Sequence, residues 1–421
     1  MAHNESSSIM FRNRFLPTFI FVAVMTATLV ARPTRIAQAG PPQVGEHTQI
    51  GIDVLEEQNF APLRGKRVGL ITNQTGMDWQ GRRTIDVLAH ADGVKLVALF
   101  SPEHGIEGKV DATVGNATDS ATGLPIYSLY GDTKRPTDQM LRGIDALVFD
   151  VQGAGVRFYT FITTMGYCME AASKHQIAFF VLDRPDPLGG EKIQGPMLDP
   201  ERMSFVGYFR MPVIYAMTLG ELAQMFNAEN RTGVELHIIA MKNWRRSQTY
   251  DQTGLKWIPP SPNLRTINEV FLYPGIEVLQ TAGVSVGRGT DAPFEQVGAP
   301  WIHADELLKN LTPRQIPGVR FTAASFTPTG GLYNGEGCEG VKVEIIDRDT
   351  FDSIRVGLEI ADAMHRLYPL RFQITRLTDL LGSQATVDAL IGFQPPASII
   401  ASWTNDLAAF RAMRAKYLIY D

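Results

Sequence analysis

The chain has 421 residues, of which 44% are hydrophobic and 20% are charged. This is an ordinary globular composition, and the length is sufficient for two domains with their own cores. The 39 basic and 44 acidic residues give a formal net charge of −5. This balance argues against a nucleic-acid groove built on bulk positive charge and favours a sugar or another small polar ligand.

The N-terminal segment has the pattern of an export signal. Arg12 and Arg14 precede an apolar run over residues 15–30, and residues 37–39 offer small side chains at the spacing of a signal-peptidase site. We therefore expect residues 1–39 to be a signal peptide and the mature protein to be periplasmic or secreted. Two further arginines between the apolar run and the cleavage site keep an uncleaved membrane anchor open as the alternative.

Apolar strand-like runs alternate with helical stretches between residue 49 and about residue 250. Strands that are apolar throughout and joined by helices predict a mostly parallel sheet covered on both faces, which is a Rossmann-like domain. No nucleotide cofactor is expected, because Gly153-Ala154-Gly155 lacks the third glycine of the dinucleotide fingerprint. The runs cover residues 67–72, 96–100, 146–150, 178–183 and 236–241.

A proline-rich segment at residues 256–262 marks the expected domain boundary, since it suits neither a helix nor a central strand. We assign residues 40–254 to the Rossmann-like catalytic domain and residues 255–421 to a smaller mixed α/β domain. In the second domain a strand is expected at 341–346. Helices are expected at 303–311, 352–368 and 403–417.

The chain contains two cysteines, Cys168 and Cys338. Cys168 lies on a predicted buried helix face and Cys338 lies at the start of a strand in the other predicted domain. We expect no disulfide, because a pair in different domains rarely meets the narrow separation limits. Two cysteines also cannot form a thiolate zinc site, and we expect neither a metal nor another cofactor.

Polar residues follow the ends of the predicted parallel strands. Asn73 follows the first strand, Glu103 and His104 the second, and Arg184 the fourth, while Asp150 ends the third. The carboxyl ends of parallel strands share one edge, so these side chains should converge on one crevice. The second domain adds Asn263 and the 287–294 loop. Such a crevice, with carboxylates, amides, hydroxyls and arginines, suits an oligosaccharide hydrolase.

Six ordered motifs together resemble the exo-β-N-acetylmuramidases, a bacterial family formerly described as a domain of unknown function. The resemblance runs from Ile52 to the C-terminus. It implies a Rossmann-like domain joined to a smaller α/β domain with a cleft between them. It also implies release of N-acetylmuramic acid from the non-reducing ends of peptidoglycan fragments. The motifs are residues 69–76, 100–108, 150–153 with 157–160, 183–185, 273–275 and 285–293.

Glycoside cleavage needs a carboxylic acid that protonates the leaving oxygen and a second group that acts as base, nucleophile or electrostatic partner. We predict Glu103 as the acid. His104 either orients this site, touches the sugar, or only hydrogen-bonds a neighbouring loop. Asp150 is the first choice for the second group, although it can also serve only to brace the loop that follows it. Asp291 and Glu295 are the next choices.

Muramic acid carries a lactyl carboxylate, which an arginine recognises in a bidentate manner. Arg157 is our first candidate for this contact and Arg288 the second. Arg184 is a third, but its position beside Pro185 and two aspartates favours an internal ion pair.

Other side chains suit hydroxyl, acetamido or ring contacts. Asn73, Asn263 and Thr290 are candidate hydrogen-bonding groups, and Asp291 is placed with them among the substrate contacts. Tyr159 or Phe294 can lie against a sugar face, with ordinary core packing as the alternative.

One departure from the family pattern affects catalysis. Many relatives carry a Glu where this chain has Gln280, which cannot act as a carboxylate. A non-catalytic binder of cell-wall saccharides is therefore the alternative function. A nucleotide-dependent transferase is disfavoured by the missing phosphate loop and the export signal.

Overall fold

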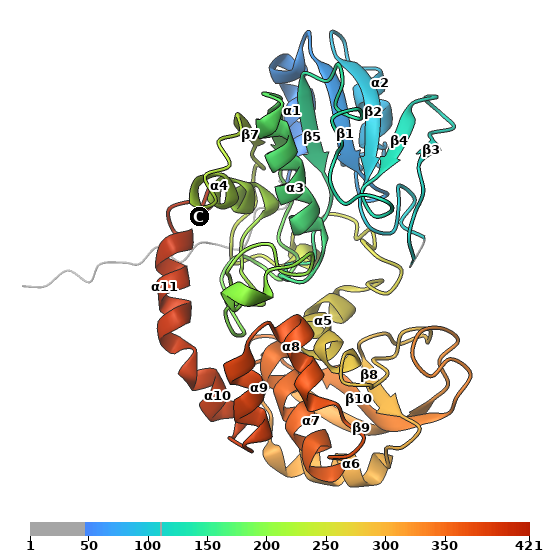
Figure 1. Ribbon diagram of the computed structural model, residues 1–421, viewed down its shortest axis with the longest axis vertical. Coiled ribbons are helices and arrows are strands. Elements are labelled where there is room, and N and C mark those ends of the chain that lie inside the picture. Colours follow the sequence, from blue (N-terminus) through green and yellow to red (C-terminus); the bar gives the residue numbers. More distant parts are fainter. Residues whose placement is uncertain (1–46, 110–111) are drawn as a thin grey trace, which may run out of the picture. The chain divides into compact units, whose positions relative to one another are not determined.

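The computed structural model describes residues 47–109 and 112–421 (Figure 1). The predicted signal peptide, residues 1–39, lies outside the described residues. Among the described helices, none combines the length and the apolar character that a membrane crossing requires.

A seven-stranded sheet forms the centre of the first half of the chain, and Figure 1 shows it in blue to green. All neighbouring strands are parallel except the short edge pair β3–β4. The order in which successive strands are added to the sheet reverses between the parallel strands β1 and β5, where Thr72 pairs with Asp150. The order is β3 (Ala117–Thr118), β4 (Pro125–Ser128), β2 (Lys95–Ser101), β1 (Arg67–Thr72), β5 (Ala146–Asp150), β6 (Ala178–Leu182) and β7 (Leu236–Ile239).

Helices cover both faces of this sheet, because alternate side chains of each buried strand point to opposite faces. In β5, Leu147 and Phe149 join the apolar core of α3 (Phe161–Lys174) and α4 (Leu219–Glu229). Ala146 and Val148 instead join the core that includes residues of α1 and α2. Those two helices span Gly51–Glu57 and Thr84–Ala89.

The second half of the chain contains a smaller antiparallel sheet. Its strand order is β8 (Gln296–Ala299), β10 (Cys338–Ile345) and β9 (Val319–Phe326). The predicted helices at 303–311 and 352–368 are present as α6 (Ala304–Leu311) and α7 (Ser353–Leu367). The fold class, a large mostly parallel sheet with a smaller mixed α/β part, is therefore confirmed. The remaining helices are α5 (Ile267–Gln280), α8 (Thr378–Leu381), α9 (Gln384–Ile391), α10 (Pro396–Ser402) and α11 (Thr404–Arg414).

The C-terminal segment returns to the first sheet, and Figure 1 shows the chain end next to α4. The guanidinium of Arg414, at the end of α11, donates to backbone carbonyls of Gly190 and Ala216. The Tyr420 hydroxyl donates to the Asp183 carboxylate over 2.6 Å. These buried contacts tie the end of the chain to the loops that follow β6.

Both cysteines are buried and free. Cys168 lies in α3 on the core side, and Cys338 is the first residue of β10.

Candidate active site

A cavity of about 360 Å³ lies beside the loop that follows β2. We call it the Glu103 pocket. Its size is near the lower end of the range for small-molecule sites. The residues that carry chemistry in its lining are Glu103, His104, Lys134, Tyr159, Thr160, Tyr273, Glu277 and Arg288.

Glu103 enters this pocket because the chain turns sharply after β2. His104 and Gly105 both have positive φ, at 71° and 75°. Only glycine adopts this backbone region readily, so His104 is held there against its own preference. The Thr160 hydroxyl, at the start of α3, donates a hydrogen bond to Oε2 of Glu103. No other hydrogen bond to Glu103 is formed within the described parts of the chain.

Glu277 and Arg288 bring a second carboxylate and a cation to the same pocket. Glu277 lies in α5, and Arg288 lies in the loop before β8. Nη2 of Arg288 is 2.7 Å from Oε1 of Glu277. The guanidinium also lies 5.2 Å from the centre of the Phe294 ring. Phe294 itself is fully buried, so its predicted alternative of core packing holds.

Tyr273 links the two carboxylates of the pocket. Burial is the main cause that raises the pKa of its hydroxyl far above the ordinary value, and the negative charges of Glu277 and Glu103 contribute. Its ring packs edge-on against Phe158 at 5.4 Å and Tyr159 at 6.0 Å. The phenol therefore lies within electrostatic reach of both acids.

The orientation of Tyr273 and Glu277 depends on close packing of α5 against α7. Gly275 lies so near α7 that an added Cβ would be 1.7 Å from the carbonyl oxygen of Ser353. The Ser353 hydroxyl accepts a hydrogen bond from the Gly275 N–H over 2.9 Å. Thus glycine is required at this position of the Tyr-Pro-Gly motif, and the helix continues through Pro274.

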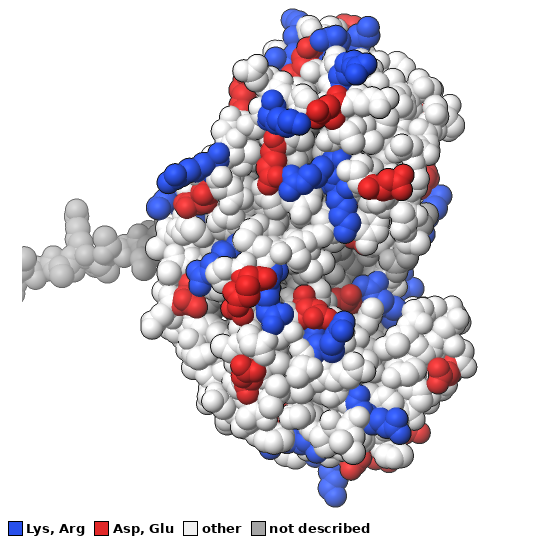
Figure 2. All heavy atoms as spheres, viewed as in Figure 1, with Lys and Arg blue, Asp and Glu red and all other residues white. Residues whose placement is uncertain are grey.

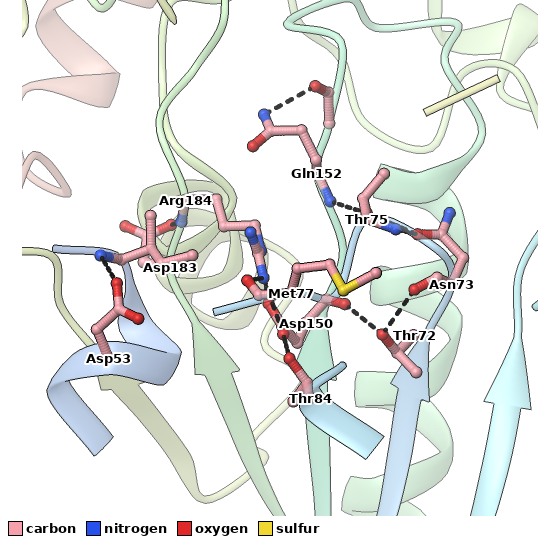
Figure 3. A network of polar contacts seen from close by, with 12 residues as sticks. Asp53, Thr72, Asn73, Thr75, Met77, Thr84, Asp150, Gln152, Asp183 and Arg184 are labelled. Atoms are coloured by element: carbon pink, nitrogen blue, oxygen red, sulfur yellow. Dashed lines mark hydrogen bonds and ion pairs between the residues drawn. The ribbon is translucent and has the colours of Figure 1, made fainter. Parts of the chain in front are cut away.

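Asp150 lies within a network of polar contacts with its neighbours, as Figure 3 shows. Its side chain is fully buried and accepts two hydrogen bonds from Arg184, at 2.6 and 3.0 Å. The Thr84 hydroxyl donates a third, at 2.5 Å. Asp150 does not line the Glu103 pocket. The expectation that it is the second catalytic group is therefore not supported, and the internal ion pair expected for Arg184 is present.

This network fills the place where an open α/β sheet usually binds its ligand, between β1 and β5. Thr72 donates to the backbone oxygen of Asp150 over 2.8 Å. Oδ1 of Asn73 accepts from the backbone N–H and the hydroxyl of Thr75, at 2.9 and 2.6 Å. The Thr75 hydroxyl in turn accepts from the N–H of Gln152 (Figure 3). Asn73 thus braces its own loop and does not line the Glu103 pocket.

Arg157 cannot read a substrate carboxylate in this structure. It is fully buried, and burial lowers the pKa of its guanidinium. Its two terminal nitrogens donate to four backbone carbonyls, at distances of 2.6–3.1 Å. These acceptors are Pro196, Met211, Leu380 and Leu381. Arg157 joins distant segments of the chain, which corrects our first choice for the lactyl contact.

The remaining predicted contacts lie outside the lining of the Glu103 pocket. The Thr290 hydroxyl donates to Gly287 over 2.6 Å and so closes its own loop. Asp291 is exposed, and its backbone oxygen accepts from Arg265 over 2.7 Å. Asn263 is partly buried, two residues beyond Ser261, which does line the pocket.

Glu277 is the residue that sequence reasoning missed. The sequence pattern instead indicated Gln280 as the position relevant to catalysis. Gln280 ends α5, is partly exposed and does not line the pocket. Glu277 lies about one helical turn earlier and supplies a carboxylate to the pocket. The available signal was a single acid inside the apolar run Ile276 to Leu279, directly after the Tyr-Pro-Gly motif.

Acidic and basic side chains are interspersed on the molecular face drawn in Figure 2. The lining of the Glu103 pocket also contains charges of both signs, namely two glutamates with Lys134 and Arg288. Such a site can protonate a leaving oxygen, stabilise a developing positive charge and hold an anionic group.

Comparison with known families gives two adjoining matches. Residues 68–268 match the N-terminal model of exo-β-N-acetylmuramidase NamZ, and residues 271–420 match its C-terminal model. The chain is 42% identical over 411 residues to the peptidoglycan β-N-acetylmuramidase NamZ of Bacillus subtilis (strain 168). That alignment covers 96% of this chain and 98% of the relative.

Two solved structures from Bacteroides fragilis NCTC 9343 have a similar fold, and both are described as DUF1343 family proteins. The first has a TM-score of 0.82 and 39% identity, and the second has 0.73 and 30%. Each comparison covers 89% of this chain and 99% of the solved one. With both family models matched in order and a relative aligned over nearly its whole length, this chain belongs to the exo-β-N-acetylmuramidase family of glycoside hydrolases.

Proposed function

We propose that this protein is an exo-acting glycoside hydrolase that releases N-acetylmuramic acid from the non-reducing ends of peptidoglycan fragments, with Glu103 as general acid. The observation that carries the proposal is that Glu103 and Glu277 line one small cavity together with two cations and a buried tyrosine. The name of the Bacillus subtilis relative supports the substrate class.

Glu103 is suited to protonate the leaving glycosidic oxygen. The Thr160 hydroxyl donates to Oε2 and fixes the carboxyl group in one orientation. Oε1 then carries the proton that is delivered to the leaving group. The position of Glu103 after β2 and opposite the start of α3 holds this oxygen at the cavity wall.

Glu277 supplies the second charged group in this mechanism. Its carboxylate lies beside the guanidinium of Arg288, which holds it in place at the cavity. A negative charge at the sugar stabilises the oxocarbenium-like transition state of glycoside cleavage. In this assignment Glu277 takes the role that we first expected of Asp150, and Gln280 does not prevent catalysis.

Recognition of the lactyl carboxylate falls to the cations that line the pocket. Arg184 and Arg157 are buried and bound to internal partners, and Arg288 is already paired with Glu277. Lys134 has no carboxylate partner within the described parts of the chain, and its ammonium lies 4.1 Å from the centre of the Phe205 ring. We assign the lactyl contact to Lys134, with Arg288 as the second cation near it.

The place of action follows from the N-terminal sequence and the substrate. Peptidoglycan lies outside the cytoplasmic membrane, so the arginines and the apolar run before residue 39 support export to the periplasm or beyond. N-terminal sequencing of the protein recovered from the producing cells tests this: cleavage after Ala39 is expected, and an intact N-terminus indicates the membrane-anchored alternative.

The decisive experiment is an assay of the purified protein with a chromogenic N-acetylmuramic acid glycoside. We expect release of the chromophore with wild type and its loss with Glu103→Gln. Binding of the glycoside by wild type without any turnover would contradict catalysis and support the alternative, a non-catalytic binder of cell-wall saccharides.

A further inference from the structure

A second cavity adjoins the Glu103 pocket. It has a volume of about 670 Å³, and Ser204 lines both cavities. The boundary between them is a tight turn in which Ser204 and Gly207 exchange two backbone hydrogen bonds of 3.0 Å. Phe205 and Val206, at the tip of this turn, face the Glu103 pocket, while Gly207 lines the second cavity. The two cavities are thus neighbours across one short turn.

Aromatic rings continue from one cavity to the other. Phe205 lies 5.9 Å from Tyr130 in the Glu103 pocket and 6.0 Å from Tyr167 in the second cavity. Tyr167 lies 5.8 Å from Tyr208, which also lines the second cavity. This series of neighbouring rings extends from the lining of one cavity to the lining of the other.

The second cavity is rich in groups that form hydrogen bonds with sugar hydroxyl and acetamido groups. Arg135, Ser173, Lys174, Asn230 and Thr232 all line it. A cavity of this kind, with aromatic surface and several polar groups, suits a carbohydrate better than an apolar ligand.

Arg135 is held in place on this surface. Its guanidinium lies 3.6 Å from the centre of the Tyr167 ring and pairs with Glu170. The Tyr208 hydroxyl also donates to Glu170, over 2.8 Å. Glu170 therefore orients Arg135 at the cavity instead of leaving it free in solvent, so less entropy is lost when a ligand binds.

We infer that the second cavity binds the saccharide on the leaving-group side of the scissile bond, so that a muro-oligosaccharide runs past Phe205 from the Glu103 pocket into the cavity around Arg135 and Tyr167. This inference rests on the proposed function. An exo-acting enzyme with a pocket for one terminal sugar must accommodate the rest of the chain outside that pocket, and the second cavity is the space that adjoins it.

The test compares two substrates, a small chromogenic N-acetylmuramic acid glycoside and a peptide-free muro-oligosaccharide. The measured quantity is the ratio of kcat/KM for the oligosaccharide to kcat/KM for the small glycoside. A charged hydrogen-bonding group contributes about 1.5–3 kcal/mol, so Arg135→Ala should lower this ratio about tenfold or more.

Arg366→Ala is the matched control. Arg366 also lies over an exposed aromatic ring, 4.7 Å from the centre of Phe393, and also pairs with a carboxylate, Asp362. It lines neither cavity, so its removal should leave the ratio at the wild-type value. Lys174→Ala provides a second variant in the cavity and should also lower the ratio.

The outcomes separate this inference from the function on which it rests. If wild type hydrolyses neither substrate, both are overturned. If wild type hydrolyses both and Arg135→Ala and Lys174→Ala leave the ratio unchanged, only the leaving-group site is overturned. With a peptide-bearing fragment as a third substrate, a fall confined to that fragment would assign the cavity to the stem peptide and would also overturn the saccharide assignment.

Discussion

Two acid–arginine pairs, Asp150–Arg184 and Glu277–Arg288, differ in their access to a cavity. Asp150 and Arg184 are buried, and Asp150 accepts three side-chain hydrogen bonds. Glu277 and Arg288 line a cavity that also contains Glu103, which accepts one hydrogen bond in the described structure. A charged pair at the edge of a sheet is therefore no sufficient sign of catalysis. Access to a cavity distinguishes the two pairs.

The positions of the strands account for this difference. Asp150 ends β5, next to β1, in the middle of the seven-stranded sheet. The loops after these strands pack on one another and exclude solvent. Glu103 follows β2, on the opposite side of β1 from β5, and accepts a hydrogen bond from Thr160 at the start of α3. The cavity therefore lies beside the loop that follows β2 and not between β1 and β5, where the strand order reverses.

The largest effect is expected from Glu103→Gln. The amide keeps the size of the side chain and its acceptor for Thr160 but cannot deliver a proton, so turnover should fall by about 10²–10⁴. Steady-state kinetics on the chromogenic glycoside measure it, and thermal unfolding should be unchanged. Glu107→Gln, at an exposed position of the same loop, is the control. Near-normal turnover of Glu103→Gln would remove Glu103 from the mechanism.

Asp150→Ala tests the contribution of the buried Asp150–Arg184 pair to stability. It leaves the buried guanidinium of Arg184 without its carboxylate, which should lower the free energy of unfolding by about 3–5 kcal/mol. Denaturant titration measures this change. Asp145→Ala, at the other end of the same strand region, removes a half-exposed partner of Arg67 and should cost no more than about 1 kcal/mol. Equal losses of unfolding free energy in the two variants would show that burial does not make the Asp150–Arg184 pair more important for stability than the exposed Asp145–Arg67 pair.

Lys134→Met tests whether Lys134, in the Glu103 pocket, binds the lactyl carboxylate. The variant should lose about three- to tenfold in kcat/KM on the muramic acid glycoside, since one charged contact at an exposed position is removed. The N-acetylglucosamine glycoside, which lacks the lactyl carboxylate, should be unaffected. Lys95→Met, at the exposed start of β2, serves as control. Equal losses on both glycosides would show that Lys134 does not recognise the lactyl group.

Asp186 is another buried carboxyl group, and it forms no ion pair in the described structure. Burial raises its pKa to about 7. Oδ1 accepts from the N–H of Leu188 over 3.0 Å, and Oδ2 has no partner in the described structure. Between about pH 4 and pH 7 the folded protein therefore holds a proton that the unfolded chain has lost, and stability decreases as the pH rises through this window.

Asp186→Asn should remove this dependence, and it gives the smallest change that we expect. The melting temperature of the variant minus that of wild type should be a few degrees greater at pH 8 than at pH 5. Differential scanning calorimetry across this range measures it. Parallel curves for the two proteins would mean that Asp186 is ionised in the folded state throughout.

Several elements were predictable because local pattern and tertiary packing agree. The runs that became β1, β5 and β6 are apolar at nearly every position, which only a strand covered on both faces requires. The acid after β2 was found by the same reasoning, because polar groups that interrupt such a run must face a loop or a cavity. In contrast, α5 escaped prediction, since Pro274 and Gly275 normally interrupt a helix.

The sequence by itself determined the parallel sheet, the smaller second part and the family, since periodicity and motif order are local properties of the chain. Tertiary structure alone decided which charges remain available. Both terminal nitrogens of Arg157 donate to carbonyls that lie up to 224 residues away, and Arg184 is paired with Asp150, 34 residues away. Glu277 reaches the pocket only because Gly275 lets α5 pack closely on α7. Hydrogen-bond saturation and burial depend on distant segments, and no local pattern records them.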